Sequence, residues 1–212
     1  MFFKRVFVFP FLKISLSERK NQVELHTSQF NLVASCFNAA FYLSHDIRRD
    51  TLVFLLFKAK NIGNLCLKFV GKDLKRFYPD EYSISGLVRN SIIKFKNHVK
   101  IHEKVDEEFQ ASPGIFVFKN SLSELVSKLN NAGYQILYPL RKGTDVRNIR
   151  FSQKIAYIVD SESLTDELSR KILHTRGTGI HFGNTLPRID IQIILLHNEL
   201  DRLETNCLSN SL

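Results

Sequence analysis

The stretch SPGIFVFKNSLSELVSKLNNAGYQILYPL, Ser112–Leu140, shows most clearly how this chain of 212 residues folds. Its apolar run IFVF predicts a strand, and Ser121 with Glu124 forms a capping box that begins a helix. Gly133 suits the left-handed conformation that ends helices, and the run YQILYPL after it is typical of a second strand. A strand, a helix and a strand in this order predict an α/β fold whose mixed, mostly parallel sheet is flanked by helices.

The same alternation extends in both directions along the chain. Further strands are expected at 2–9, 51–58, 65–70, 155–159 and 179–182, and further helices at 27–43, from 79 onward, at 163–173 and from 190 onward. Residues 10–26 are predicted to be loop, and 142–145 a turn. On the last helix Ile193, Leu196, Leu200 and Leu203 recur at helical spacing and are expected to face the core.

The charge of the chain is unevenly distributed. The net charge is +9 and the pI is about 9.5, which favours a polyanionic partner, first a nucleic acid and second an anionic membrane surface. Residues 1–104 carry 18 basic and 8 acidic residues, whereas residues 105–212 carry 12 and 13. We interpret 1–212 as a single domain with a basic, polyanion-binding half (1–104) and a near-neutral half (105–212).

Several classes of protein are excluded by composition. The longest apolar runs are far shorter than the ~20 residues of a membrane-spanning helix. The opening residues MFFKRVFVFPFLK are interrupted by charge and by proline, so we interpret them as a strand rather than an export signal. Cys36, Cys66 and Cys207 are odd in number and widely spaced, which excludes a disulfide framework and suits a reducing, cytoplasmic environment.

Three short patterns could carry chemistry. His98 and His102 have helical spacing, but no third ligand completes a metal site, so none is predicted. His45-Asp46 is similar to the metal-binding pair of HD-type phosphohydrolases, a third alternative that needs further ligands on other helices. The run Arg48–Asp50 at a helix-to-strand junction places two guanidinium groups, which bind phosphate or carboxylate, beside a carboxylate that can accept a proton.

Five longer motifs in the same order resemble those of the archaeal tRNA pseudouridine-54 N1-methyltransferases and their bacterial relatives. They are FYLSHDIRRDT (41–51), CLKFVG (66–71), LK (74–75) with PDE (79–81), SPGI (112–115) and HNELD (197–201). The first is long and specific, and the resemblance covers nearly the whole chain.

The resemblance implies an α/β domain of the SPOUT class whose C-terminal segment forms a trefoil knot. It also implies a homodimer that binds S-adenosylmethionine in the knot and methylates N1 of a pseudouridine in the T arm of tRNA. Carried over to this sequence, the cofactor residues are Pro139, Val159, Phe182, Gly183, Asn184, Thr185, Leu186, Pro187 and Gln192. Val159 stands where the family usually has glycine, Asn184 where it has proline, and Gln192 where it has cysteine.

These motifs assign candidate roles. We expect Asp50 to act as the base or to orient it, with Arg48 and Arg49 holding the uracil-like ring or the flanking phosphate. The residues expected to contact the RNA backbone are Lys72, Lys75, Arg76 and Arg89. The departures at Val159 and Gln192 leave open an alternative, a non-catalytic RNA-binding protein with a degenerate cofactor pocket.

Overall fold

The computed structural model describes residues 4–17, 22–25, 27–59, 63–75, 77–78, 80–102, 108–159 and 167–209. By their contacts these residues divide into two units. We call Phe11–Ser121 the inserted unit, because it interrupts the other unit in the sequence. Met1–Pro10 and Leu122–Leu212 form the terminal unit, which contains both ends of the chain. The boundary between them falls within the first strand, β1 (Lys4–Ser17).

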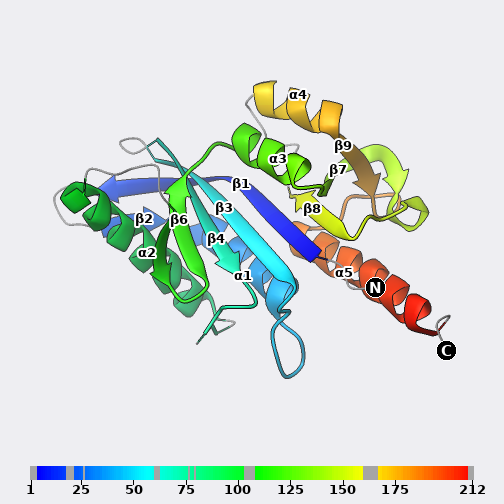
Figure 1. Ribbon diagram of the computed structural model, residues 1–212, viewed down its shortest axis with the longest axis horizontal. Helices are drawn as coiled ribbons and strands as arrows, with labels where there is room; N and C mark the ends of the chain where they lie inside the picture. The colour runs from blue at the N-terminus through cyan, green and yellow to red at the C-terminus, as the bar shows by residue number, and fades with distance from the viewer. Residues whose placement is uncertain are drawn as a thin grey trace. The chain divides into compact units, whose positions relative to one another are not determined.

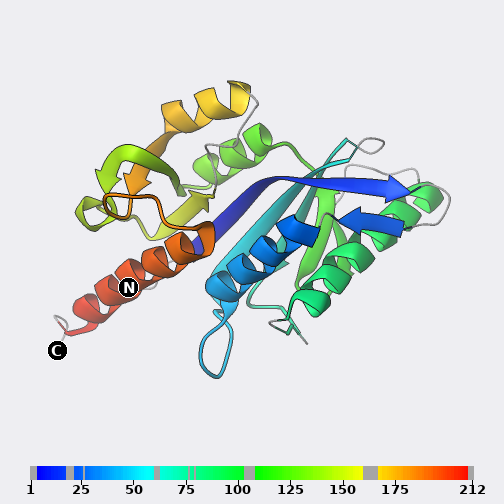
Figure 2. The ribbon, with the colours of Figure 1, turned by 180° about the vertical axis from the view of Figure 1, so that it is seen from behind.

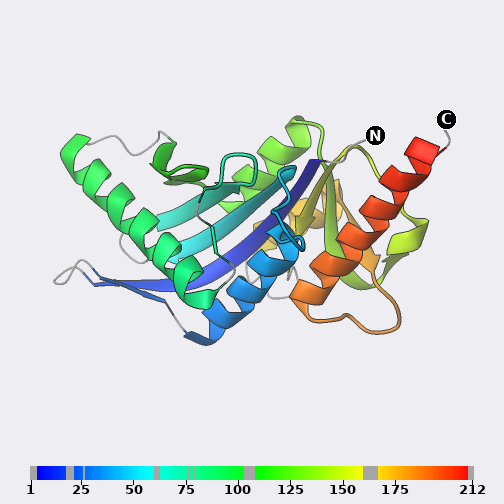
Figure 3. The ribbon, with the colours of Figure 1, turned by 90° about the horizontal axis from the view of Figure 1, so that it is seen from below.

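The inserted unit is an antiparallel sheet covered by two helices (Figure 3). The strands follow the order β5-β6-β4-β3. Helix α1 lies against β3, α2 lies against β5 and β6, and the two helices contact each other. The elements are β2 (Gln22–Leu25), α1 (Thr27–Phe41), β3 (Thr51–Ala59), β4 (Gly63–Val70), α2 (Glu81–His102), β5 (Phe109–Ser112) and β6 (Ile115–Lys119).

The core of the inserted unit is rich in aromatic rings. Val33, Phe37 and Phe41 recur every four residues on α1, so they share one helix face, and all three are buried. The ring of Phe37 meets that of Phe69 on β4 edge-on, with centroids 4.8 Å apart and planes at 84°. On α2 the residues Ile84, Val88, Ser91 and Phe95 are buried and form its inner face.

The terminal unit is a parallel sheet with helices on both sides. Its strands follow the order β1-β8-β7-β9, and every neighbouring pair is parallel. Helices α3 and α4 lie on one side of these strands and α5 on the other (Figure 1). The elements are α3 (Leu122–Asn131), β7 (Gln135–Asp145), the 3₁₀ turn η1 (Val146–Asn148), β8 (Lys154–Ile158), α4 (Glu167–Arg176), β9 (Gly177–His181) and α5 (Ile189–Ser209). The predicted α/β fold with a mixed sheet is confirmed.

A buried arginine fixes α5 on the first strand. Arg5 is 1% exposed, and its Nη1 donates to His197 Nδ1 at 2.9 Å and to Asp201 Oδ1 at 2.7 Å. Nη2 lies 3.2 Å from Glu204 Oε2. A buried guanidinium needs such partners, because its charge is otherwise costly to remove from water. The tail motif at 197–201 therefore holds α5 in place.

The prediction of loop at 10–26 was wrong for 10–17 and 22–25, whereas 18–21 and 26 lie outside the described residues. β1 continues to Ser17, and its last residues pair antiparallel with β2, Ile14 with Leu25 and Ser17 with Gln22 (Figure 2). A hairpin of this kind is held by its ladder of backbone hydrogen bonds, and a hydrophobic period cannot reveal it. Strand β5 was not foreseen either.

The turn predicted at 142–145 is also wrong, because β7 extends to Asp145 and pairs again with β9 beyond a register shift. A Cβ on Gly143 would lie 2.4 Å from the carbonyl oxygen of Gly179. Glycine therefore serves the close approach of two strands at this point rather than a turn. Leu203, expected on the inner face of α5, is 38% exposed. The start predicted for α4, at 163, lies outside the described residues.

Candidate active site

The segment between α1 and β3 is a closed loop that presents Arg48–Asp50. The amide of Arg48 donates to the carbonyl of Phe41 at 2.6 Å, and Tyr42 and Ile47 form a bridge between the two arms of the loop. Inside that bridge the amide of Leu43 donates to the carbonyl of Asp46 at 2.8 Å. These backbone bonds hold the arginines and the aspartate where β3 begins.

Gly71 brings a second motif against this loop. Its amide donates to the carbonyl of Thr51 at 2.9 Å, and a Cβ there would lie 2.3 Å from the carbonyl oxygen of Arg48. Gly114 brings the third motif to the same place, because its carbonyl accepts a hydrogen bond from the amide of Val70 at 2.8 Å. Its φ is +75°, a conformation that favours glycine. Segments 41–51, 66–71 and 112–115 therefore meet at one place in the inserted unit.

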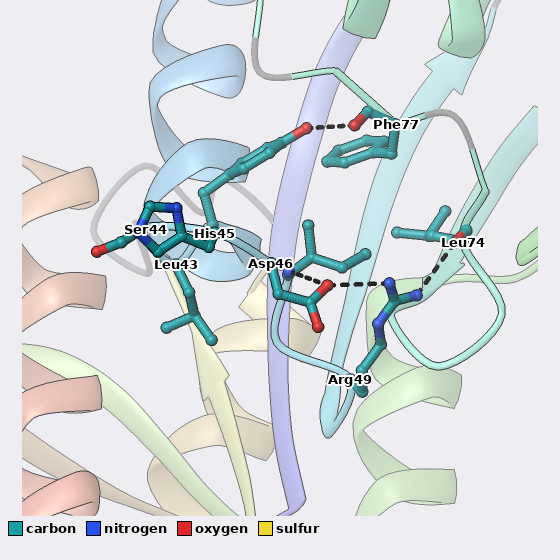
Figure 4. Close-up of a pocket in the computed structure, with 9 residues that line it drawn as sticks. Leu43, Ser44, His45, Asp46, Arg49, Leu74 and Phe77 are labelled. Atoms are coloured by element: carbon teal, nitrogen blue, oxygen red, sulfur yellow. Dashed lines mark hydrogen bonds and ion pairs between the residues drawn. The ribbon is translucent and has the colours of Figure 1, made fainter.

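Arg49 ties these segments together (Figure 4). Its Nη1 donates to the carbonyl oxygens of Gly71 and Leu74 at 3.3 and 3.2 Å, and its Nη2 lies 3.0 Å from Asp46 Oδ1. The same Oδ1 accepts from the amide of Ile47 at 2.7 Å. The Ile47 amide and then Arg49 hold the pKa of Asp46 below its usual value, so this carboxylate is ionised at neutral pH.

The other expected catalytic groups are reachable from solvent. Asp50 is exposed, and its Oδ1 lies 3.5 Å from the hydroxyl of Thr51, while Arg48 is half-buried. Lys72 and Lys75 are exposed on the turn that Arg49 binds, whereas Arg89 is exposed on α2. Arg76 lies outside the described residues. The structure therefore gathers the predicted residues at 48–50, 72 and 75 around one turn.

A pocket of about 420 Å³ opens beside this turn. It is lined by Tyr42–Ile47, Arg49, Leu74 and Phe77, and neither Arg48 nor Asp50 belongs to its wall. The rings of Tyr42 and Phe77 are stacked, with centroids 5.6 Å apart, and the Tyr42 hydroxyl donates to the Phe77 carbonyl at 2.6 Å. Burial, and then the charge of Asp80, raises the pKa of Tyr42 to about 12, so its hydroxyl stays protonated. The sequence alone did not indicate this pocket, although most of its wall lies in the first motif.

The residues expected to bind a cofactor gather in the terminal unit. Pro139 on β7 is level with Ile180 on β9, and Val159 directly follows β8, the strand on the other side of β7. Phe182–Pro187 begin the loop after β9. In α/β sheets, ligands bind outside the carboxyl ends of parallel strands, where these segments lie.

At this edge the loop after β9 carries exposed polar groups, which suit a nucleoside-type cofactor, whereas Val159 is buried. Val159 is 1% exposed and its amide donates to the carbonyl of Val8 at 2.9 Å, so its branched side chain does not project into accessible space. Gly183 has a φ of +128°, which favours glycine, and Asn184 and Thr185 are exposed polar residues.

Gln192 holds this loop through a side-chain hydrogen bond. It is buried on α5, where its Oε1 accepts from the Tyr157 hydroxyl at 2.5 Å and its Nε2 donates to the Pro187 carbonyl at 2.6 Å. The Phe182 ring meets Tyr157 edge-on, with centroids 6.1 Å apart. Both ends of the Gln192 amide are thus used within the protein, and Tyr157 is a further residue of the site. Only its place in a buried strand marked it in the sequence.

We predict that Gln192→Leu lowers the free energy of unfolding by about 1–3 kcal/mol, because it leaves the buried Tyr157 hydroxyl without an acceptor. Adding Tyr157→Phe should recover part of this loss, since both partners are then apolar. Urea denaturation of the two single variants and the double variant measures the coupling free energy between Gln192 and Tyr157. Strictly additive losses would show that the hydrogen bond contributes nothing.

The chain is similar to several known proteins. A family model described as "Putative SAM-dependent RNA methyltransferase" matches residues 19–205. The tRNA (pseudouridine(54)-N(1))-methyltransferase of Methanocaldococcus jannaschii is 30% identical over 93% of this chain and 97% of its own length. That of Methanococcus vannielii is 30% identical over 84% and 87%. The crystal structure of Archaeoglobus fulgidus Nep1 bound to S-adenosylhomocysteine shares the fold, with a TM-score of 0.59 and 12% identity over 97% of this chain and all of that one.

Proposed function

We propose, since this chain belongs to the family of SAM-dependent RNA methyltransferases, that it transfers a methyl group to N1 of a pseudouridine in the T arm of tRNA. The observation that carries the proposal is the meeting of segments 41–51, 66–71 and 112–115 around Gly71. Three motifs far apart in the sequence meet at one loop, which carries two arginines and a carboxylate. The names of the relatives support the substrate.

Asp50 is proposed as the group that takes the proton. When bound, S-adenosylmethionine supplies a methyl group that N1 attacks, and the sulfur leaves with the electron pair of the broken bond. N1 must lose its proton as it attacks, and a positioned carboxylate that accepts it accelerates such a step about 10²–10⁴-fold. Asp50 is exposed at the start of β3, where an RNA base can reach it.

The two arginines are proposed to act differently. Arg48 binds the uracil-like ring or the phosphate beside it, because a guanidinium donates two parallel hydrogen bonds to such groups. The Arg49 guanidinium already engages the carbonyls of Gly71 and Leu74 and the carboxylate of Asp46. These contacts favour a positioning role for Arg49, which holds the loop that carries Asp50.

In the terminal unit we propose that the backbone of Phe182–Pro187, together with Pro139, holds S-adenosylmethionine, whereas Val159, which is 1% exposed, makes no contact with it. Gln192 keeps the loop in shape through the Pro187 carbonyl.

A trefoil knot in this half, a homodimer and a cytoplasmic location remain parts of the proposal. Ile191 and Ile194 on α5 are 40% and 49% exposed. An exposed apolar face of this kind supports the proposed dimer. Light scattering after gel filtration tests whether the chain forms a dimer.

Incubation with labelled S-adenosylmethionine and tRNA that carries pseudouridine in its T arm tests the function. We expect label in the tRNA and none in tRNA with uridine at that position, because uridine has no N–H at the corresponding ring atom. A family member of known activity serves as the parallel control. Calorimetry with S-adenosylmethionine separates the alternative, a non-catalytic RNA-binding protein, which would not bind it. Absence of label while the control enzyme works would refute the proposal.

We predict that Lys72→Gln and Lys75→Gln weaken RNA binding to a similar extent for every RNA sequence. Each lost phosphate contact should reduce the slope of log K against log salt by about 0.7–0.9, because fewer counterions are released. Arg89→Gln tests whether the RNA also reaches α2. Lys171, an exposed lysine on α4, is the control, and Lys171→Gln should leave the slope unchanged. Fluorescence anisotropy at several salt concentrations measures both quantities.

A further inference from the structure

The pocket beside Arg49 combines an apolar wall with polar side chains, among them Ser44, His45 and Asp46. Tyr42 and Phe77 stack on each other, and Leu43 at the rim is 46% exposed. The Tyr42 hydroxyl already donates to the Phe77 carbonyl, so the phenol ring serves the pocket as an apolar surface. Aromatic and apolar walls of this kind bind the flat faces of unpaired nucleobases.

Asp46 supplies the carboxylate of this pocket wall. Its Oδ1 is used by the Ile47 amide and by Arg49, whereas Oδ2 has no hydrogen-bond partner among the described residues (Figure 4). The side chain is 62% exposed, so a ligand can reach it. An ionised carboxylate accepts hydrogen bonds and donates none. A ligand held by Oδ2 must therefore bring a hydrogen-bond donor, such as the N–H of a nucleobase.

The occupant differs from the base that reacts. Asp50, which takes the proton in the proposed function, does not line this pocket, and neither does Arg48. A base held here would therefore be a neighbour of the reacting pseudouridine in the RNA. Lys72 and Lys75 are exposed on the turn that contributes Leu74 to the wall, and their charges suit the phosphates on either side of such a base.

We infer that this pocket binds an unpaired adenine, cytosine or guanine of the RNA substrate, whose exocyclic amino group donates to Asp46 Oδ2. The inference rests on the proposed function and adds a second base-binding site to it. Uracil lacks an amino group and has carbonyl oxygens on both sides of its N3–H. The Asp46 carboxylate repels these oxygens, so uracil binds less well. Asp46 thus acts by excluding the wrong base as well as by binding the right one.

The decisive variant is Asp46→Asn. Asparagine keeps an oxygen for the Ile47 amide and for Arg49, and it replaces Oδ2 with an amide that donates. We use T-arm stem-loop RNAs in which each unpaired base except the pseudouridine is changed to uridine, one at a time. For each RNA we measure Kd by fluorescence anisotropy, and methyl transfer in parallel. Asp73→Asn is the matched control, because Asp73 is an exposed carboxylate on the same turn but outside the pocket.

For the native protein we expect one loop position at which uridine raises Kd about 10-fold, the size of a lost hydrogen bond to a charged group. Asp46→Asn should abolish or reverse this penalty, and Asp73→Asn should keep it. The inference is overturned if no position shows a penalty, or if Asp46→Asn leaves the penalty unchanged. Methyl transfer that proceeds normally in those cases leaves the proposed function standing, whereas failure of transfer to every RNA refutes that function itself.

Discussion

Asp50→Asn is expected to lower the rate of methyl transfer about 10²–10⁴-fold, the usual contribution of a general base. Asparagine has nearly the shape of aspartate but cannot take the proton that N1 of pseudouridine loses. Asp50 is exposed, so the free energy of unfolding should change by less than about 0.5 kcal/mol. Single-turnover rates with saturating RNA and S-adenosylmethionine measure the effect on chemistry alone.

The control for this prediction is Asp73→Asn, which removes a negative charge from the neighbouring turn and should leave the rate nearly unchanged. RNA affinity should not fall in either variant, since a carboxylate repels phosphate. If Asp50→Asn turns over at the native rate at every pH, Asp50 takes no part in the proton transfer. A loss explained entirely by weaker RNA binding would likewise remove the base from the mechanism.

Gly71→Ala is expected to lower both stability and turnover. The new Cβ would lie 2.3 Å from the Arg48 carbonyl oxygen and 2.8 Å from that of Thr51, so the backbone on both sides of Asp50 must move. Overpacking of this kind costs about 1–3 kcal/mol. A shift of the loop by about 1 Å can lower the rate about 100-fold, because the reacting groups lose alignment. Urea denaturation and single-turnover kinetics measure the two effects.

Gly86→Ala provides the matched control. Gly86 lies inside α2, and a Cβ there would meet nothing within 4 Å. Alanine is the better helix former, so this substitution should raise the free energy of unfolding by about 0.5–1 kcal/mol and leave the rate unchanged. Equal effects of the two substitutions would show that the close approach at Gly71 is not what holds the loop.

The sequence was most informative where structure is local. The capping box at Ser121 and Glu124 predicted a helix that begins at Leu122, and Gly133 ends it with a φ of +81°. It failed where a strand depends on a partner. The hairpin of β1 with β2 and the second pairing of β7 with β9 are held by ladders of backbone hydrogen bonds, which a hydrophobic period does not encode.

The candidate site likewise has features that the sequence shows and features that only the structure shows. The run Arg48–Asp50 stands out in the sequence because two guanidinium groups beside a carboxylate are chemically unusual, and the motifs place the chain in its family. The sequence does not show that Arg49 binds the Gly71 and Leu74 carbonyls, or that Asp46 borders a pocket.

Residue types and their spacing therefore determined the α/β class, the basic first half and the family of this protein. Tertiary structure alone decided that the Arg49 guanidinium binds two backbone carbonyls and that Asp50 is exposed at the start of β3. The physical reason is that a hydrogen bond depends on distances of about 3 Å between atoms that can lie far apart in the chain. Those distances exist only once the turn at Gly71 has closed against the loop at 41–51.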